Sequence, residues 1–244
     1  VGVVSLAQYR SRFDILFADR LKNRYLGLDT QIIGPEDIRA IPPITKNDSL
    51  IGALHDPLDG HLDPSGTTHA YAKAARMGGA TIEIDCKVIE TSHRADGSWD
   101  VVTDKGTIHT EHVVNAGGLW AREVGAMAGV YLPLHPMEHQ YIVTDDIAII
   151  YERDHEHPHV MDPSGESYLR QEGRGLCIGF YEQPCKPWAV DGTPWEFGHE
   201  LLANDFDKIN DSIEFAYKRF PVLETAGVKS VVHGPFTFAP DGNP

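Results

Sequence analysis

Apolar and polar residues recur along this chain with two different periods, which predict two kinds of element. Between residues 8 and 26 the apolar side chains return every three or four positions, the spacing of one helical face. Short apolar runs bounded by Gly, Pro or Asp are typical of strands. Helices are expected over residues 8–26, 34–41, 65–77 and 200–219, and directly after Gly118. Strands are expected over residues 1–7, 50–54, 80–84, 87–92, 99–103, 107–109, 113–114, 140–144, 168–171, 176–181 and 228–232.

One turn between such elements can approach a ligand. The stretch from Val113 to Ala121 is expected to be a buried strand that passes through Gly117 and Gly118 into a helix. Glycine has no Cβ and tolerates positive φ, so the backbone there can come close to a phosphate or a flat ring. A tight connection that binds nothing has the same pattern.

The order of elements favours a mixed α/β fold. A helix, a β-meander with a hairpin turn at Asp96-Gly97, and a return strand at 113–114 are typical of an α/β nucleotide-binding layer. From residue 131 onward the pattern changes to antiparallel strands. We therefore expect two interleaved layers rather than two consecutive domains.

Composition narrows the class of function. The 244 residues are 41% hydrophobic and carry a formal net charge of −15, without a basic run. This excludes nucleic acid and anionic membrane surfaces as expected partners and favours a small-molecule substrate. Three cysteines are too few for a disulfide framework, so a reducing compartment is expected: the cytoplasm, or the mitochondrial matrix in a eukaryote. No apolar run reaches the length of a transmembrane span.

Four segments resemble the FAD-dependent amine oxidoreductases of the D-amino-acid-oxidase superfamily, and within it the dimethylglycine and sarcosine dehydrogenase group. They are residues 59–64 (DGHLDP), 114–125 (VNAGGLWAREVG), 133–141 (PLHPMEHQY) and 167–172 (SYLRQE). The final residues 234–241 (GPFTFAPD) are similar to the family's turn near the flavin ring. The Gly-x-Gly-x-x-Gly turn that seats the ADP half of FAD in this family is absent from the sequence. We therefore expect an internal piece of a longer enzyme.

The resemblance implies an incomplete Rossmann-like FAD-binding domain interleaved with an antiparallel-sheet substrate domain. Residues 1–55 and 131–233 are assigned to the substrate domain, 56–130 to the FAD-binding domain, and 234–244 to a return towards it. The cofactor-binding residues implied are Val88, Ala116, Gly117, Gly118, Trp120, Gly234 and Pro235. For His61, a structural turn is the preferred interpretation.

The resemblance also implies the residues that carry chemistry. His139 and Tyr168 match the family's substrate-site His and Tyr, which suits a reaction that must manage one proton. Arg170 shares a strand face with Tyr168 and is a candidate for the substrate carboxylate, although a salt-bridged surface Arg is an equal alternative. Tyr141 shares a face with His139 and is a candidate for substrate binding.

One competing site is a metal centre. His155, His157 and His159 alternate as metal ligands on a strand can, but Pro158 and the dense charge favour an exposed loop. No metal is expected.

The implied function is oxidative N-demethylation of N,N-dimethylglycine, sarcosine or a similar amino acid. A hydride passes to FAD, and the resulting iminium ion is hydrolysed to formaldehyde or passed to tetrahydrofolate in a further domain. Two alternatives remain: a non-catalytic relative similar to the pyruvate dehydrogenase phosphatase regulatory subunit, and another amine or amino-acid oxidase of the superfamily. The sequence leaves the electron acceptor unidentified.

Overall fold

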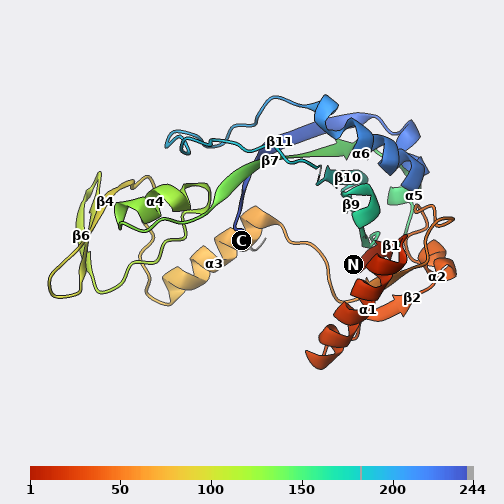
Figure 1. The fold of residues 1–244 in the computed structure, drawn as a ribbon, viewed down its shortest axis with the longest axis horizontal. Helices are drawn as coiled ribbons and strands as arrows, with labels where there is room; N and C mark the ends of the chain where they lie inside the picture. The colour runs from red at the N-terminus through yellow and green to blue at the C-terminus, as the bar shows by residue number, and fades with distance from the viewer. Residues whose placement is uncertain (182, 241–244) are drawn as a thin grey trace. The chain divides into compact units, whose positions relative to one another are not determined.

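The computed structural model describes residues 1–181 and 183–240, and Figure 1 shows the order of their elements. Contacts divide the chain into two compact units, each built from segments distant in the sequence. Unit 1 consists of Val1–His61, His139–Cys185 and Leu201–Gly234. Unit 2 consists of Leu62–Glu138, Lys186–Glu200 and Pro235–Pro244, of which residues 241–244 lie outside the described part.

An eight-stranded sheet provides the frame of unit 1, in the order β11-β7-β10-β9-β8-β1-β3-β2. From β7 to β2 the neighbours are antiparallel, except that β8 and β1 are parallel. The strands are β1 (Val3–Ala7), β2 (Gln31–Ile33), β3 (Gly52–Asp56), β7 (His135–Thr144), β8 (His159–Asp162), β9 (Ser167–Glu172), β10 (Gly175–Phe180) and β11 (Val228–Phe238). The helices are α1 (Arg10–Tyr25), α2 (Pro35–Ala40), α5 (Ala148–Tyr151) and α6 (Phe206–Arg219), with 3₁₀ turns at Pro163–Gly165 and Pro221–Thr225.

Helix α6 contributes to the main core of unit 1. Its buried residues are spaced by three or four positions, as expected for one helical face: Ile209, Ser212, Ala216 and Arg219. Ile209 and Ala216 join a cluster that includes Leu169 of β9 and Ile178 of β10. The helix begins at Phe206 rather than near residue 200 as predicted, because the Asp205 side chain caps it by accepting a hydrogen bond from the Lys208 amide at 3.2 Å.

A buried ion pair connects this helix to the sheet. Arg219 at the end of α6 is 4% exposed, and its Nε donates to Asp162 Oδ2 of β8 at 2.8 Å. The same guanidinium donates to the Lys46 carbonyl and to Gln8 Oε1, at 2.8 and 2.9 Å. Every nitrogen of the guanidinium thus has an acceptor, which is the condition under which a buried charge is tolerated.

The histidine-rich segment is the exposed loop that we predicted only in part, since His155 is exposed but His157 and Pro158 are buried. His157 is 1% exposed, and its amide donates to Gln171 Oε1 at 3.0 Å. His159 begins β8 and lies beside Val3 of β1. The dense charge therefore indicated exposure correctly for His155 but not for His157 and His159, which the contacts with Gln171 and β1 hold against the sheet. Among the described residues no group of three or more His, Cys, Asp or Glu side chains is arranged to hold a metal ion.

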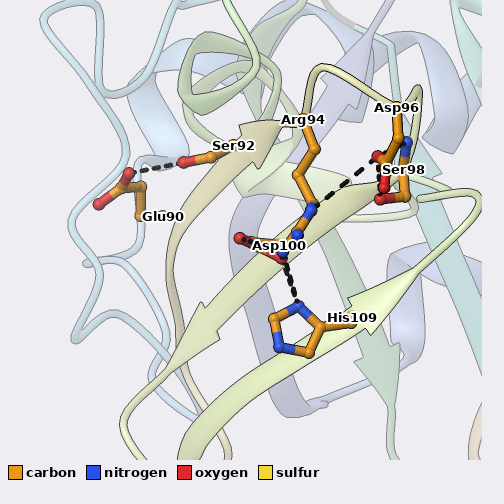
Figure 2. A network of polar contacts seen from close by, with 7 residues as sticks. All are labelled: Glu90, Ser92, Arg94, Asp96, Ser98, Asp100 and His109. Carbon is orange, nitrogen blue, oxygen red and sulfur yellow. Dashed lines mark hydrogen bonds and ion pairs between the residues drawn. The ribbon is translucent and has the colours of Figure 1, made fainter.

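Unit 2 contains the predicted meander. Strands β4 (Val88–His93), β5 (Trp99–Thr103) and β6 (Gly106–Thr110) form an antiparallel three-stranded sheet. Figure 2 shows the polar network over this sheet, in which Asp100 accepts from Arg94 at 3.0 Å and also contacts His109. These two partners lower the pKa of Asp100, and the contacts join β5 to β6 and to the turn that follows β4. The remaining elements are α3 (Pro64–Met77), the 3₁₀ turn Gly118–Trp120 and α4 (Ala121–Met127).

Two predicted strands of unit 2 are wrong in this structure. Residues 80–84 and 113–114 pair with no described strand, and Val114 is 87% exposed rather than buried. Helix α3 likewise buries none of its residues. An apolar pattern alone does not make a strand, which also needs a hydrogen-bonded neighbour, and the described residues supply none for these two segments.

No described helix combines the length and the apolar character needed to cross a bilayer.

Arg219→Met is expected to lower the free energy of unfolding by about 3–5 kcal/mol, because it leaves the carboxylate of Asp162 buried and unpaired. Arg10→Met is the matched control, since the Arg10–Asp14 pair on α1 is exposed and should change stability by less than about 1 kcal/mol. Denaturant unfolding of both variants measures the difference. Equal losses for the two pairs would contradict the role given to Arg219.

Candidate functional site

Two histidines and three tyrosines of unit 1 gather on the sheet face opposite to the one that packs against α6. Registers align Tyr141 of β7, Gly179 of β10, Tyr168 of β9 and Met161 of β8, so these residues point to one side. Alternation along each strand adds further residues to the same side. We call this surface the aromatic face and define it by His139, Tyr141, His159, Tyr168 and Tyr181.

Ring contacts fix the geometry of the aromatic face. The His139 ring stacks on Tyr181 with centroids 5.0 Å apart and on Tyr168 at 6.2 Å. Tyr168 also contacts His159 edge-on at 5.6 Å and Tyr181 at 5.7 Å. Tyr168 therefore lies between two histidines from different strands. The structure brings together the two residues predicted to be catalytic.

A single glycine makes room for Tyr168. A Cβ built on Gly179 of β10 would lie 2.2 Å from Cζ and 2.4 Å from Oη of Tyr168. No side chain tolerates that approach, so the tyrosine ring crosses the neighbouring strand only because residue 179 is glycine.

Burial governs the protonation of His139. Desolvation lowers the pKa of His139 below 6.5, and the nearby His233 lowers it further, whereas a hydrogen bond with the Phe180 backbone opposes the shift. The imidazole is therefore neutral at pH 7 and able to accept a proton.

The tyrosines and the thiol of this face also stay protonated. Burial raises the pKa of Tyr168 strongly and that of Tyr141 more modestly, and Cys177 adds to both shifts. Burial raises the pKa of Cys177 to about 11, so its sulfur is a neutral thiol and not a nucleophile at pH 7. The aromatic face thus presents neutral hydrogen-bonding groups.

Arg170 lies on the predicted face, but it has a partner within the chain. Its Nη1 forms an ion pair with Glu172 and donates to the Gln171 carbonyl at 3.3 Å. The salt-bridged alternative considered for this residue is therefore the geometry observed, and its charge next to Tyr168 is partly neutralised.

The sequence did not indicate Tyr181, Gly179, Cys177 or His159 as members of this site. The strand alternation 177–179–181 was available as a signal for the first three. For His159 the available signal was its place in a regular His-x-His pattern, which was weighed only as a metal motif.

The side chain of Asn115 fixes the conformation of the predicted cofactor turn in unit 2 through two hydrogen bonds. Asn115 Nδ2 donates to the Ala121 carbonyl at 2.8 Å, and its Oδ1 accepts from the Gly117 amide at 3.1 Å. A Cβ on Gly117 would lie 3.1 Å from the Ala121 nitrogen, so a larger residue would require the backbone of α4 to shift. Gly118 has a φ of +54° and open space where a Cβ would stand.

The other predicted cofactor residues differ in their surroundings. The indole Nε1 of Trp120 donates to the Pro194 carbonyl at 2.9 Å, so this group holds the segment Lys186–Glu200 in unit 2. Val88 opens β4 and is half-buried. Gly234 and Pro235 lie inside β11 rather than in the predicted turn. Proline is compatible with this strand because β11 is at the edge of the sheet, where a missing N–H is tolerated.

Comparison with known proteins identifies the class. The family model described as "FAD dependent oxidoreductase" (DAO) matches residues 1–244. The chain belongs to this DAO family of FAD-dependent oxidoreductases, and FAD is its cofactor.

Individual relatives extend the comparison. The chain is 38% identical to the mitochondrial dimethylglycine dehydrogenase of Mus musculus over 98% of its own length, and 35% identical to the mitochondrial sarcosine dehydrogenase of Homo sapiens over 100%. It spans only 28% and 26% of those proteins. The crystal structure of L-proline dehydrogenase from P. horikoshii superposes with a TM-score of 0.83 at 25% identity, covering all of this chain and 62% of that one.

The turn at residues 115–118 fits FAD. Asn115 satisfies the Gly117 amide and the Ala121 carbonyl, and no atom lies within 4 Å of the place where a Cβ on Gly118 would stand. A flat or anionic group can therefore approach this backbone closely. Ala116, Gly117 and Gly118 remain the predicted cofactor contacts, with Val88 on the neighbouring sheet.

Gly179→Ala is expected to slow flavin reduction by the FAD-loaded enzyme at least tenfold, because the added methyl group displaces the Tyr168 ring. Stopped-flow absorbance of the flavin measures the rate. Gly198→Ala is the control, since a Cβ there meets no atom within 4 Å and its φ is ordinary. A Gly179→Ala variant with the wild-type rate would show that the ring position is unimportant.

Proposed function

We propose that the protein containing this chain oxidises an N-methylated amino acid such as N,N-dimethylglycine or sarcosine. The observation that carries the proposal is the contact of a neutral, half-buried His139 with Tyr168 and Tyr181. The identity to dimethylglycine and sarcosine dehydrogenases supports the choice of substrate class. Bound FAD supplies the acceptor for the hydride that leaves the N-methyl carbon.

His139 is assigned the role of proton acceptor. An aliphatic amine is a cation at pH 7, and its C–H bond can release a hydride only after the nitrogen has lost its proton. A neutral imidazole beside the amine takes that proton. The electron-rich faces of Tyr168 and Tyr181 favour the cationic amine while it binds.

Tyr168 is assigned the role of orienting the substrate. Its raised pKa keeps the phenol protonated, so the hydroxyl donates a hydrogen bond to a substrate oxygen. Tyr141 borders the same surface, and Arg170 adds positive charge that is shared with Glu172. Both remain proposed substrate-binding residues.

The two units receive different roles in this proposal. Unit 1 carries the aromatic face and is assigned to substrate binding, and unit 2 carries residues 115–118 and is assigned to FAD. A eukaryotic protein of this kind is placed in the mitochondrial matrix, by analogy with the mitochondrial relatives.

His139→Ala and Tyr168→Phe are each expected to lower the rate of flavin bleaching by about a hundredfold in the full-length enzyme, with FAD content unchanged. The reductive half-reaction with dimethylglycine or sarcosine measures the rate, and the flavin absorbance of the purified protein measures FAD content. His155→Ala, at an exposed position, is the control. A wild-type rate in either variant would remove that residue from the mechanism. A wild-type enzyme bleached by no methylated amino acid would favour the regulatory or other-substrate alternatives.

The pH dependence of flavin reduction is expected to reveal His139. Because burial lowers its pKa, the neutral form persists below pH 6.5 and is lost only at lower pH. The rate should therefore fall on an acid limb centred below pH 6.5, and His139→Ala should lack that limb. Rates measured from pH 5 to 8 test this, and an unchanged limb in the variant would contradict the assignment.

A further inference from the structure

A second histidine of the aromatic face has no role in the mechanism described above. His159 lies on β8 next to Tyr168, at the side opposite to His139 in the order of strands. Its Nε2 atom is buried and has no hydrogen-bond partner among the described residues. Buried polar atoms nearly always have a partner, so an unsatisfied one beside the proposed substrate surface points to a ligand atom.

The charges around His159 indicate whether the ligand atom beside it is positively or negatively charged. Burial, His61 and Arg170 lower the pKa of His159, and Asp59 opposes them. The positive charge of Arg170, which disfavours a proton on this ring, equally favours an anion beside it. Arg170 lies beside His159 on the neighbouring strand and on the same face, because the antiparallel register pairs the adjacent residues Val160 of β8 and Leu169 of β9.

The opposite end of the aromatic face has a different character. His139 is surrounded by the rings of Tyr168 and Tyr181, which suit an amine rather than an anion. The two ends thus match the two ends of an amino acid, with Tyr168 between them.

We propose that His159 determines specificity by donating a hydrogen bond from Nε2–H to the carboxylate of the substrate, so that the site selects amino carboxylates over amines without a carboxylate. This rests on the proposed function, since it assigns the substrate end that His139 does not contact. The positive charge of Arg170 attracts the substrate carboxylate from a distance, while the Arg170 guanidinium stays ion-paired with Glu172.

The test uses methoxyacetate, a carboxylate that cannot be oxidised at nitrogen, and methoxyacetamide, its uncharged counterpart. Calorimetric titration of the full-length FAD-loaded enzyme gives Kd for each. His159→Phe keeps an aromatic ring against Tyr168 but removes the N–H, and it should raise Kd for methoxyacetate about tenfold or more, the effect of one hydrogen bond to a charged group. Kd for methoxyacetamide should change less than threefold. His159→Gln retains an N–H donor and should stay within about threefold for both ligands, as should the exposed control His155→Phe.

Several results would overturn the proposal. These are an unchanged Kd for methoxyacetate in His159→Phe, an equal loss for both ligands, or wild-type enzyme that does not bind methoxyacetate. If His159→Phe does not fold, the ring nitrogen shifts of His159 in the wild type decide, because methoxyacetate should move them and methoxyacetamide should not. Binding of methoxyacetate through His159 in an enzyme that no methylated amino acid reduces would uphold this contact while rejecting the proposed reaction.

Discussion

The ion pair between Arg219 and Asp162 is the contact on which the rest of unit 1 depends. Asp162 is 0% exposed at the end of β8, and Arg219 ends the helix that covers the sheet. Because the guanidinium also binds the Lys46 carbonyl and Gln8, it joins four distant stretches of chain. The pair fixes α6 to one face of the sheet. The other face is consequently the one on which polar side chains gather.

The aromatic face on the other side of the sheet consists mainly of titratable groups that stay neutral at pH 7. The residues of the aromatic face lose water on folding, and desolvation therefore holds His139 and His159 as neutral imidazoles and Tyr168 as a phenol. Arg170, the charged residue beside Tyr168, is paired with Glu172. A surface with neutral donors and acceptors can bind a zwitterion without placing a permanent charge next to the amine, and this is what a reaction of the neutral amine requires.

Sequence patterns predicted the individual helices and strands more accurately than which strands pair with one another. The helical spacing of α1 and the meander of β4, β5 and β6 are local signals, and both are confirmed. The start of α6 was wrong because a cap at Asp205 overrides the propensity of the residues before it. Residues 80–84 and 113–114 were wrong because strand formation depends on neighbours, which a local pattern does not contain.

The same distinction applies to the site. His139 and Tyr168 were recognisable through resemblance, and the structure brings their rings into contact. Gly179 could not be identified, since its importance is the absence of a side chain opposite Tyr168 in the strand register. His159 was visible but misinterpreted, because its alternation with His155 and His157 is the same for a metal site and for a strand. Only the pairing of β8 with β9 separates these interpretations: it turns His159 towards Tyr168, while His157 is buried with its amide bonded to Gln171.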